Sequence, residues 1–418
     1  MNEIPRDHKL DQSINVLREG YQFLPKRFER LHTDIFETTL LAEKVICLTG
    51  EEGAGLFYNT EKFKRKGALP KRIEKSLFGE NAIQSMDGDP HEHRKLLFMS
   101  LMTPERMSSL YDLTSQQWKL KAGSWKPEDE IVLFEEAKDV LCRAVCQWAG
   151  IPLEEDEVKE RAEQLWLMID AFGAVGTRHR KGRKARTESE KWMTKKILSV
   201  RAGELAAPED SALHKMAFHL DIEGNHLDAG MAAIELLNVI RPTVAVAAYI
   251  SFGALALHEN NELKHYLRSD DKNMEFFAKE IRRLFPFVPY LGARVKRDFE
   301  WNGFTFKEGR LVLLDIHGTN HDKRLWEQPN RFMPERFEEW KGGLFDLIPQ
   351  GGGEHYKGHR CPGEWITMEA IKASIRFLTE EIEYDVPSQD LSYSLRRMPS
   401  MPKSGFIISN VRLKAVQV

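Results

Sequence analysis

The chain has 418 residues, 42% of them hydrophobic and 30% charged, which is typical of a soluble globular protein. Its net charge of −3 provides no overall field that would attract nucleic acid or an anionic membrane. Four cysteines are too few for a disulfide framework, residues 1–17 are polar, and no run of 18 apolar residues occurs, so we expect a cytoplasmic protein without a membrane anchor.

Neither an internal repeat nor a low-complexity linker is visible, so we expect residues 1–418 to form a single domain. The elements predicted first along the chain are a short amphipathic helix over 10–19, a strand over 38–49, a helix over 51–58, a helix over 89–101 with Pro90 in its first turn, and a long helix over 129–148. Cys142 and Cys146 are four residues apart on the last helix. That spacing allows metal binding, but without further ligands we expect both thiols in the core.

The most basic run is 178–186, which reads RHRKGRKAR and follows the glycine-flanked segment 172–176. This composition predicts an exposed loop between helices. A nucleic-acid or lipid-headgroup site is one interpretation of such a run. A solvated loop, whose charge helps to steer anionic substrates, is the interpretation we adopt.

Residues 226–258 are rich in Ala, Leu and Val, which predicts a central, buried helix interrupted at Arg241 and Pro242. Beyond residue 291, turns separate short strand-like pieces at 299–306 and 310–316, and 391–413 has a similar pattern. The predicted fold class is therefore mainly α with small β-sheets at the two ends.

The segment 350–364, QGGGEHYKGHRCPGE, delivers Cys361 to the start of an apolar, helix-periodic stretch. A helix N-terminus and the cations of the segment stabilise thiolate over thiol. A thiolate can be a nucleophile, a zinc ligand or an iron ligand. Zinc needs more Cys or His at short spacing, which His355 and His359 leave open although no CxxC pair exists. The glycines let the backbone approach something large and flat, which suits one axial thiolate on haem iron.

Two further motifs precede this loop. Glu280 and Arg283 form an ExxR pair spaced to share a helix face, and the segment 332–337, FMPERF, supplies Arg336. This order of motifs resembles the cytochrome P-450 superfamily. The resemblance implies the P-450 fold, with haem b between a long central helix and the Cys loop and with Cys361 as the metal ligand. It also implies a buried network of Glu280, Arg283 and Arg336 behind the haem.

The Cys loop departs from the usual superfamily pattern. Glu354 and Lys357 stand where an aromatic residue and a glycine are expected, and three glycines lie upstream at 351–353 instead. This elongated form resembles the bacterial fatty-acid peroxygenases, a branch that includes hydroxylases and an alkene-forming decarboxylase.

In the central helix, Arg241 and Pro242 replace the acid and alcohol that relay protons in most oxygen-activating members. A buried arginine is costly unless paired. It either forms a structural ion pair with a glutamate elsewhere or grips an anionic ligand bidentately. Arg-Pro is also what the fatty-acid peroxygenases have. The resemblance thus implies a hydrogen-peroxide-dependent enzyme, without an obligatory reductase, that hydroxylates long-chain fatty acids at the α or β carbon. The carboxylate held by Arg241 would act as general acid–base.

The resemblance also implies the remaining site residues. His91, Lys95 and Arg294 match positions that bind haem propionates. The positions that line the distal pocket are Phe78, Gln84, Ile169, Phe172 and Phe287. In related enzymes a histidine at position 84 accompanies alkene formation and a glutamine accompanies hydroxylation, so Gln84 joins Arg241 and Pro242 as a catalytic candidate. The alternatives are a decarboxylase giving terminal alkenes, a reductase-dependent haem monooxygenase, and a haem-binding sensor or carrier without turnover.

Overall fold

The computed structural model describes residues 3–7 and 11–414. Its helices are α1 (Ser13–Glu19), α2 (Phe23–Leu31), α3 (Gly50–Phe57), α4 (Lys71–Ile73), α5 (Gly88–Met99), α6 (Pro104–Ala122), α7 (Leu133–Ala149), α8 (Val158–Asp170), α9 (Gly176–Arg201), α10 (Ala212–Phe218), α11 (Ala229–Ala245), α12 (Ala247–Glu259), α13 (Glu262–Ser269), α14 (Asp271–Leu284), α15 (Ile316–Asn320) and α16 (Glu364–Arg376). Short helical turns are η1 (Gly20–Gln22), η2 (Glu74–Phe78), η3 (Ile83–Ser85), η4 (Glu155–Glu157), η5 (Pro334–Phe337) and η6 (Phe377–Glu381).

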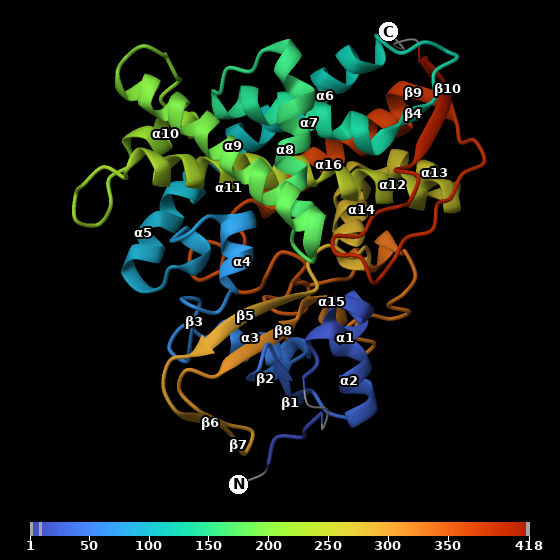
Figure 1. Ribbon diagram of the computed structural model, residues 1–418. Coiled ribbons are helices and arrows are strands. Elements are labelled where there is room, and N and C mark those ends of the chain that lie inside the picture. The colour runs from blue at the N-terminus through green and yellow to red at the C-terminus, as the bar shows by residue number, and fades with distance from the viewer. Residues whose placement is uncertain (1–2, 8–10, 415–418) are drawn as a thin grey trace.

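The strands are β1 (Ile35–Leu40), β2 (Glu43–Leu48), β3 (Phe63–Lys64), β4 (Ile131–Val132), β5 (Tyr290–Val295), β6 (Phe299–Trp301), β7 (Phe304–Phe306), β8 (Leu311–Asp315), β9 (Ile382–Asp385) and β10 (Ile407–Leu413). A five-stranded sheet has the order β1-β2-β8-β5-β3, a three-stranded sheet the order β4-β10-β9, and β6 pairs with β7. The two larger sheets lie at opposite ends of a mainly helical body (Figure 1). The predicted fold class is thereby confirmed.

The predicted central helix is present as α11 and α12, which run through the middle of the helical body (Figure 1). Together they are long and apolar enough to cross a membrane, but 94% of their most apolar stretch is buried inside the protein. The interruption predicted at Arg241 and Pro242 lies elsewhere, because α11 continues through Pro242 and breaks at Val246. Proline removes one helical donor, and a helix held on all sides by packing accommodates that loss without ending.

Three other local predictions need correction. The stretch 38–49 is not one strand but the β1–β2 hairpin, whose turn residues Leu41 and Ala42 have φ values of 50° and 61°. The basic run 178–186 is not a loop, because it forms the first part of α9. Of the stretch 391–413, only β10 is a strand. In each case the residue pattern is compatible with two local structures, and packing against the rest of the protein selects one of them.

The core placement of the paired cysteines is confirmed. Cys142 and Cys146 on α7 are fully buried among apolar side chains from α6, α8 and α11. In the described part of the chain no group of three or more His, Cys, Asp or Glu side chains could hold a metal ion. Residue 10, predicted as the start of the first helix, lies outside the described residues, and α1 begins at Ser13.

Candidate active site

Cys361 lies at the end of an irregular segment that leads into α16. Its backbone N–H donates to the Gln350 carbonyl across 3.1 Å, which closes the segment into a loop. Gly351 and Gly353 have φ values of 97° and 90°, which side-chain-bearing residues rarely adopt. A Cβ on Gly351 would also lie 2.8 Å from the Tyr58 hydroxyl. The upstream glycines are therefore required for the close packing that presents the sulfur.

Burial raises the pKa of the Cys361 thiol above its ordinary value. The Gly363 N–H and the nearby Lys95 charge oppose this effect and lower the pKa. The expected preference for thiolate over thiol is therefore wrong for the side chain in this environment, because desolvation outweighs the groups that favour the charged form. A metal ion binds the deprotonated sulfur and releases its proton, so the raised pKa is compatible with ligation.

A series of hydrogen-bonded polar side chains, here called the polar chain, extends to the same sulfur and was not predicted from the sequence. Gln350 Nε2 lies 3.8 Å from Cys361 Sγ, and Gln350 Oε1 accepts from Arg282 Nε across 2.9 Å. Because arginine carries donors only, the carboxamide oxygen must face Arg282 and its NH₂ group must face the sulfur. Arg282 also donates to Glu364 Oε1 across 2.5 Å, so a buried ion pair holds the chain in place. No motif in the sequence signals the role of Gln350.

The structure brings the three predicted network residues together. Glu280 is fully buried, and its two oxygens accept from Arg283 across 2.7 and 2.8 Å. Arg336 Nε lies 3.2 Å from Glu280 Oε1, which also accepts from the Met333 N–H. Arg283 and Arg336 donate further to backbone carbonyls of the segment 327–331. The network therefore fixes this segment against α14, close to the polar chain behind Cys361.

A second cluster lies beside the Cys loop. Lys95 donates to the Gly358 carbonyl across 3.3 Å and also to the Arg360 carbonyl. The rings of His91 and His359 are 4.1 Å apart. Burial lowers the pKa of Lys95 to about 8, of His91 to about 3 and of His359 to about 4. Buried donors of this kind favour the arrival of carboxylates, as haem propionates would be.

A further cation, Arg65, lies near this cluster, and Arg294 is bound by other groups. Arg65, which the sequence did not single out, is buried and stacks its guanidinium 4.2 Å from the centre of the Phe57 ring. Arg294 instead binds Glu43, at 2.5 and 3.1 Å, and the carbonyls of Gly67 and Gly309. Most of its donors are therefore occupied in this structure, and the propionate role expected of Arg294 stays a prediction.

On the other side of the site, Arg241 projects from α11 and is 97% buried. Its Nε and Nη1 have no hydrogen-bond partner, and no ion pair to it occurs among the described residues. Burial and then the charge of Arg186 lower the pKa of Arg241 to about 9, whereas the Cys361 sulfur acts to raise it. The structural ion pair weighed as an alternative is thus absent from the described part of the chain. A buried guanidinium with free donors is arranged to receive an anion.

Residues of the turns η2 and η3 lie around Arg241. Its guanidinium carbon lies 5.4 Å from the centre of the Phe78 ring. Arg186 holds the Leu77 and Phe78 carbonyls at 2.9 and 3.2 Å. Asn238, three residues before Arg241 on α11, donates to the Phe78 carbonyl and lies 3.4 Å from Gln84 Oε1. Phe78 therefore lies beside Arg241, and Asn238 links Phe78 to Gln84.

The other predicted pocket residues lie around this group. Ile169 and Phe287 pack on the same hydrophobic cluster, and Phe287 stacks on Tyr249 of α12 with ring centres 4.8 Å apart. Phe172 is half-buried in the turn between α8 and α9. Pro242 follows Arg241 inside α11 and lacks the N–H that would bond to the Asn238 carbonyl.

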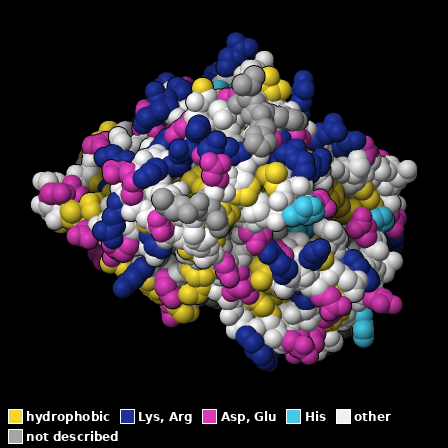
Figure 2. Space-filling model, turned by 90° about the horizontal axis from the view of Figure 1, so that it is seen from below, with side chains coloured by type: hydrophobic (Ala, Val, Ile, Leu, Met, Phe, Trp, Pro, Cys, Tyr) yellow, Lys and Arg dark blue, Asp and Glu magenta, His cyan; other side chains and the backbone are white. Residues whose placement is uncertain are grey.

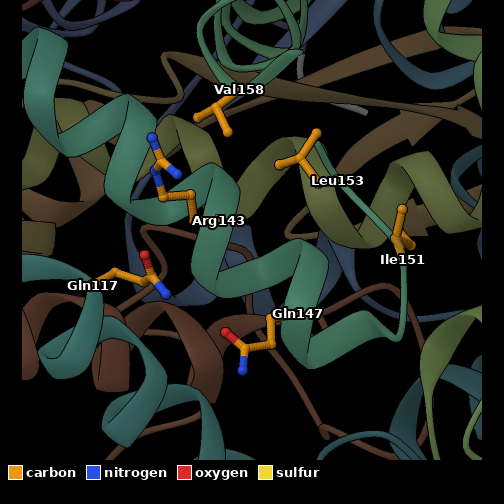
Figure 3. Close-up of a pocket in the computed structure, with 6 residues that line it drawn as sticks. All are labelled: Gln117, Arg143, Gln147, Ile151, Leu153 and Val158. Carbon is orange, nitrogen blue, oxygen red and sulfur yellow. The ribbon is translucent and has the colours of Figure 1, made fainter. Parts of the chain in front are cut away.

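A surface cavity of about 300 Å³ lies apart from these residues (Figure 3). It is lined by Gln117, Arg143, Gln147, Ile151, Leu153 and Val158. None of them is a predicted site residue, and Arg143 is already bound to Glu155. This cavity therefore takes no part in the candidate site.

Comparison with known proteins agrees with this geometry. A family model described as cytochrome P450 matches residues 258–402. The structure of cytochrome P450EX alpha (CYP152N1) with myristic acid is 43% identical, covers 99% of this chain and 100% of its own, and has a TM-score of 0.96. Cytochrome P450SP alpha (CYP152B1) in complex with (R)-ibuprophen is 43% identical over 96% and 99% of the two chains, with a TM-score of 0.94. A variant of cytochrome P450 OleT in complex with arachidonic acid is 38% identical over 99% and 100%, with a TM-score of 0.96.

Proposed function

The chain belongs to the cytochrome P450 family and is a haem-thiolate enzyme of its CYP152 peroxygenase group, and on this premise we propose that it is a hydrogen-peroxide-dependent fatty-acid hydroxylase. The expected P-450 fold is confirmed by the full-length likenesses. In this proposal, residues 1–418 act as one domain in the cytoplasm, and long-chain fatty acids are oxidised at the α or β carbon without an obligatory reductase.

The observation that carries the proposal is the set of free donors on Arg241. A buried guanidinium offers two parallel N–H groups to a carboxylate, and such charge-assisted pairs are strong in a site without water. The apolar side chains Phe78, Ile169 and Phe287 provide the surroundings that an alkyl chain needs. A molecule with one carboxylate and a long alkyl tail, which is a fatty acid, satisfies both requirements.

The residues around Cys361 fit a haem. The sulfur stands on a glycine-rich loop with Gly363 N–H and Gln350 Nε2 directed at it. Beside it, Lys95, His91 and Arg65 form a buried group of donors with few acids, which suits two propionates. The Cys361 thiolate would hold haem b here, and the haem would supply the iron at which peroxide is activated.

Peroxide activation needs a general acid–base, and α11 presents Arg241 and Pro242 where one would otherwise stand. We infer that the fatty-acid carboxylate held by Arg241 takes over this task. It accepts a proton from hydrogen peroxide and returns that proton to the oxygen that leaves as water. Arg241 keeps the carboxylate ionised and fixes its position, which places the α and β carbons nearest the reacting oxygen.

Gln84 is the second determinant in this proposal. It lies beside Asn238 and Phe78, within the group around Arg241. A glutamine amide has no proton to give at neutral pH, unlike an imidazolium. We therefore expect 2- or 3-hydroxy acids as the main products and terminal alkenes as minor ones.

Holoprotein, hydrogen peroxide and a C14 to C16 fatty acid, incubated without any reductase, test this proposal. Hydroxy acids detected by gas chromatography and mass spectrometry would support it. Oxidation that requires a reductase and dioxygen would identify a conventional monooxygenase. If hydrogen peroxide gives no turnover, the protein would be a haem-binding carrier instead. Alkene as the main product would identify a decarboxylase.

A further inference from the structure

The basic run of α9 forms one side of a charged surface. Residues 174–187 contain six Lys or Arg and no Asp or Glu, which gives this segment +6 in a chain whose net charge is −3. Elsewhere cations and acids are mixed, as on the lower face of the molecule (Figure 2). Charge of one sign gathered on a single helix creates a local potential that the net charge conceals.

Packing forces the α9 cations outward. A Cβ on Gly182 would lie 2.3 Å from the Ala171 Cβ and 2.7 Å from the Leu167 carbonyl, so α9 meets α8 there at backbone distance. The helical period then places Arg180 and Lys184 on the side opposite Gly182, and it places Lys181 and Arg183 on the two flanks. All four are exposed.

The short helix α4 extends this surface. Arg72 Nη2 donates to the Ala174 carbonyl across 3.1 Å, which joins α4 to the turn that begins α9. Arg72 is itself exposed. We call Arg72, Arg180, Lys181, Arg183 and Lys184 the cationic patch. None of the five forms an ion pair within residues 3–7 and 11–414, so their charges are available to a partner.

The cationic patch adjoins both segments that carry predicted pocket residues. The turn η2, which ends at Phe78, follows α4 directly, and Phe172 lies just before α9. Val175, at the start of α9, is 54% exposed beside these cations. An exposed aliphatic side chain among cations suits the boundary between headgroups and acyl chains of a bilayer.

We propose that the cationic patch is a docking surface for bilayers that contain anionic phospholipids. Each cation near such a surface adds electrostatic attraction, and an apolar side chain such as Val175 adds contact with the acyl region. Nucleic acid is the less suitable partner, because residues 174–187 offer no Phe, Tyr or Trp on which bases could stack. Docking here brings the Phe78 and Phe172 segments close to a source of acyl chains.

Vesicle flotation of the holoprotein tests the proposal. We expect the holoprotein to float with phosphatidylglycerol vesicles at about 0.05 M salt and to be released from them at about 0.5 M salt. It should not float with phosphatidylcholine vesicles. The patch variant Arg180→Glu/Lys181→Glu/Arg183→Glu/Lys184→Glu should bind at least roughly tenfold more weakly.

The matched control is Lys26→Glu/Lys272→Glu/Lys323→Glu/Lys341→Glu, which changes the net charge equally at exposed cations without ion pairs among the described residues. It should bind at least roughly tenfold more tightly than the patch variant. If the patch variant lacks haem, the milder Arg180→Gln/Lys184→Gln replaces it and should bind measurably more weakly than wild type. Equal loss in patch and control variants would overturn the proposal. So would wild-type protein that does not bind phosphatidylglycerol vesicles, or that binds single-stranded DNA more tightly than vesicles.

Discussion

The side-chain nitrogen of Asn238 lies 3.4 Å from Oε1 of Gln84, and it lies 3.2 Å from a carboxylate oxygen of Glu235. This contact turns the Gln84 oxygen toward α11 and its NH₂ group away from Asn238. Glu235 is fully buried, and it also accepts from the Ile83 N–H across 3.0 Å. The turn that carries Gln84 is therefore fixed from α11, one helical turn before Arg241.

Gln84→Leu and Gln84→His separate shape from proton donation at this position. We expect Gln84→His to raise the share of terminal alkene severalfold, because an imidazole can donate a proton near neutral pH. Gln84→Leu removes the contact with Asn238 without adding a proton donor, so its alkene share should stay near that of wild type. Gas chromatography of turnover products decides the matter. Equal alkene shares in all three proteins would show that product choice lies elsewhere.

Cys361→Ala should abolish thiolate ligation. The reduced, carbon-monoxide-bound wild type is expected to absorb at the long wavelength typical of a thiolate ligand, because Cys361 is the cysteine presented by the glycine loop. Cys47→Ala, which removes a buried cysteine of the N-terminal sheet, is the control and should retain the band. A band that persists in Cys361→Ala would refute the ligand assignment.

Gln350→Glu should lower the reduction potential of the bound haem. The glutamate can still accept from Arg282, but it no longer donates an N–H toward the Cys361 sulfur, so the thiolate gains electron density. Thr367→Val is the control, since Thr367 touches the same Gln350 amide without touching the sulfur in any described contact. Spectroelectrochemistry measures both. An unchanged potential in Gln350→Glu would mean that the 3.8 Å contact has no electronic effect.

Asp315→Asn should stabilise the protein at neutral pH. Burial raises the pKa of Asp315 to about 8, far above the value of about 4 expected in an unfolded chain. Between these values the folded state binds more protons, so the stability that this group contributes is lost as the pH rises from about 4 to about 8. An asparagine can still accept from the Gly318 N–H, as Asp315 Oδ1 does across 2.8 Å. Urea unfolding should show the gap between variant and wild type widening with pH, and a constant gap would contradict this pKa.

Much of this architecture could be predicted because its signals are local. The ExxR spacing places Glu280 and Arg283 on one face of α14, and the glycines of the Cys loop reveal its need for unusual backbone angles. Gln350 could not be found in this way, since its contact with Arg282 joins residues far apart in the chain. The stacking of Arg65 on Phe57 is closer in sequence, but no residue pattern marks it. The contact between Arg294 and Glu43 could not be predicted either, because these two residues are far apart in the chain and meet only in the folded protein.

The central claim is that Arg241 holds the fatty-acid carboxylate that acts as acid–base. Removing one partner of a buried charge pair costs several kcal/mol, so Arg241→Ala should lose fatty-acid oxidation on the order of a hundredfold or more while keeping its haem. The most direct measurement compares peroxide-driven turnover of a C14 acid in wild type and Arg241→Ala, and of the C14 alcohol in wild type. The account predicts turnover of the acid by wild type alone. Unchanged turnover in the variant, or oxidation of the alcohol as fast as the acid, would contradict it.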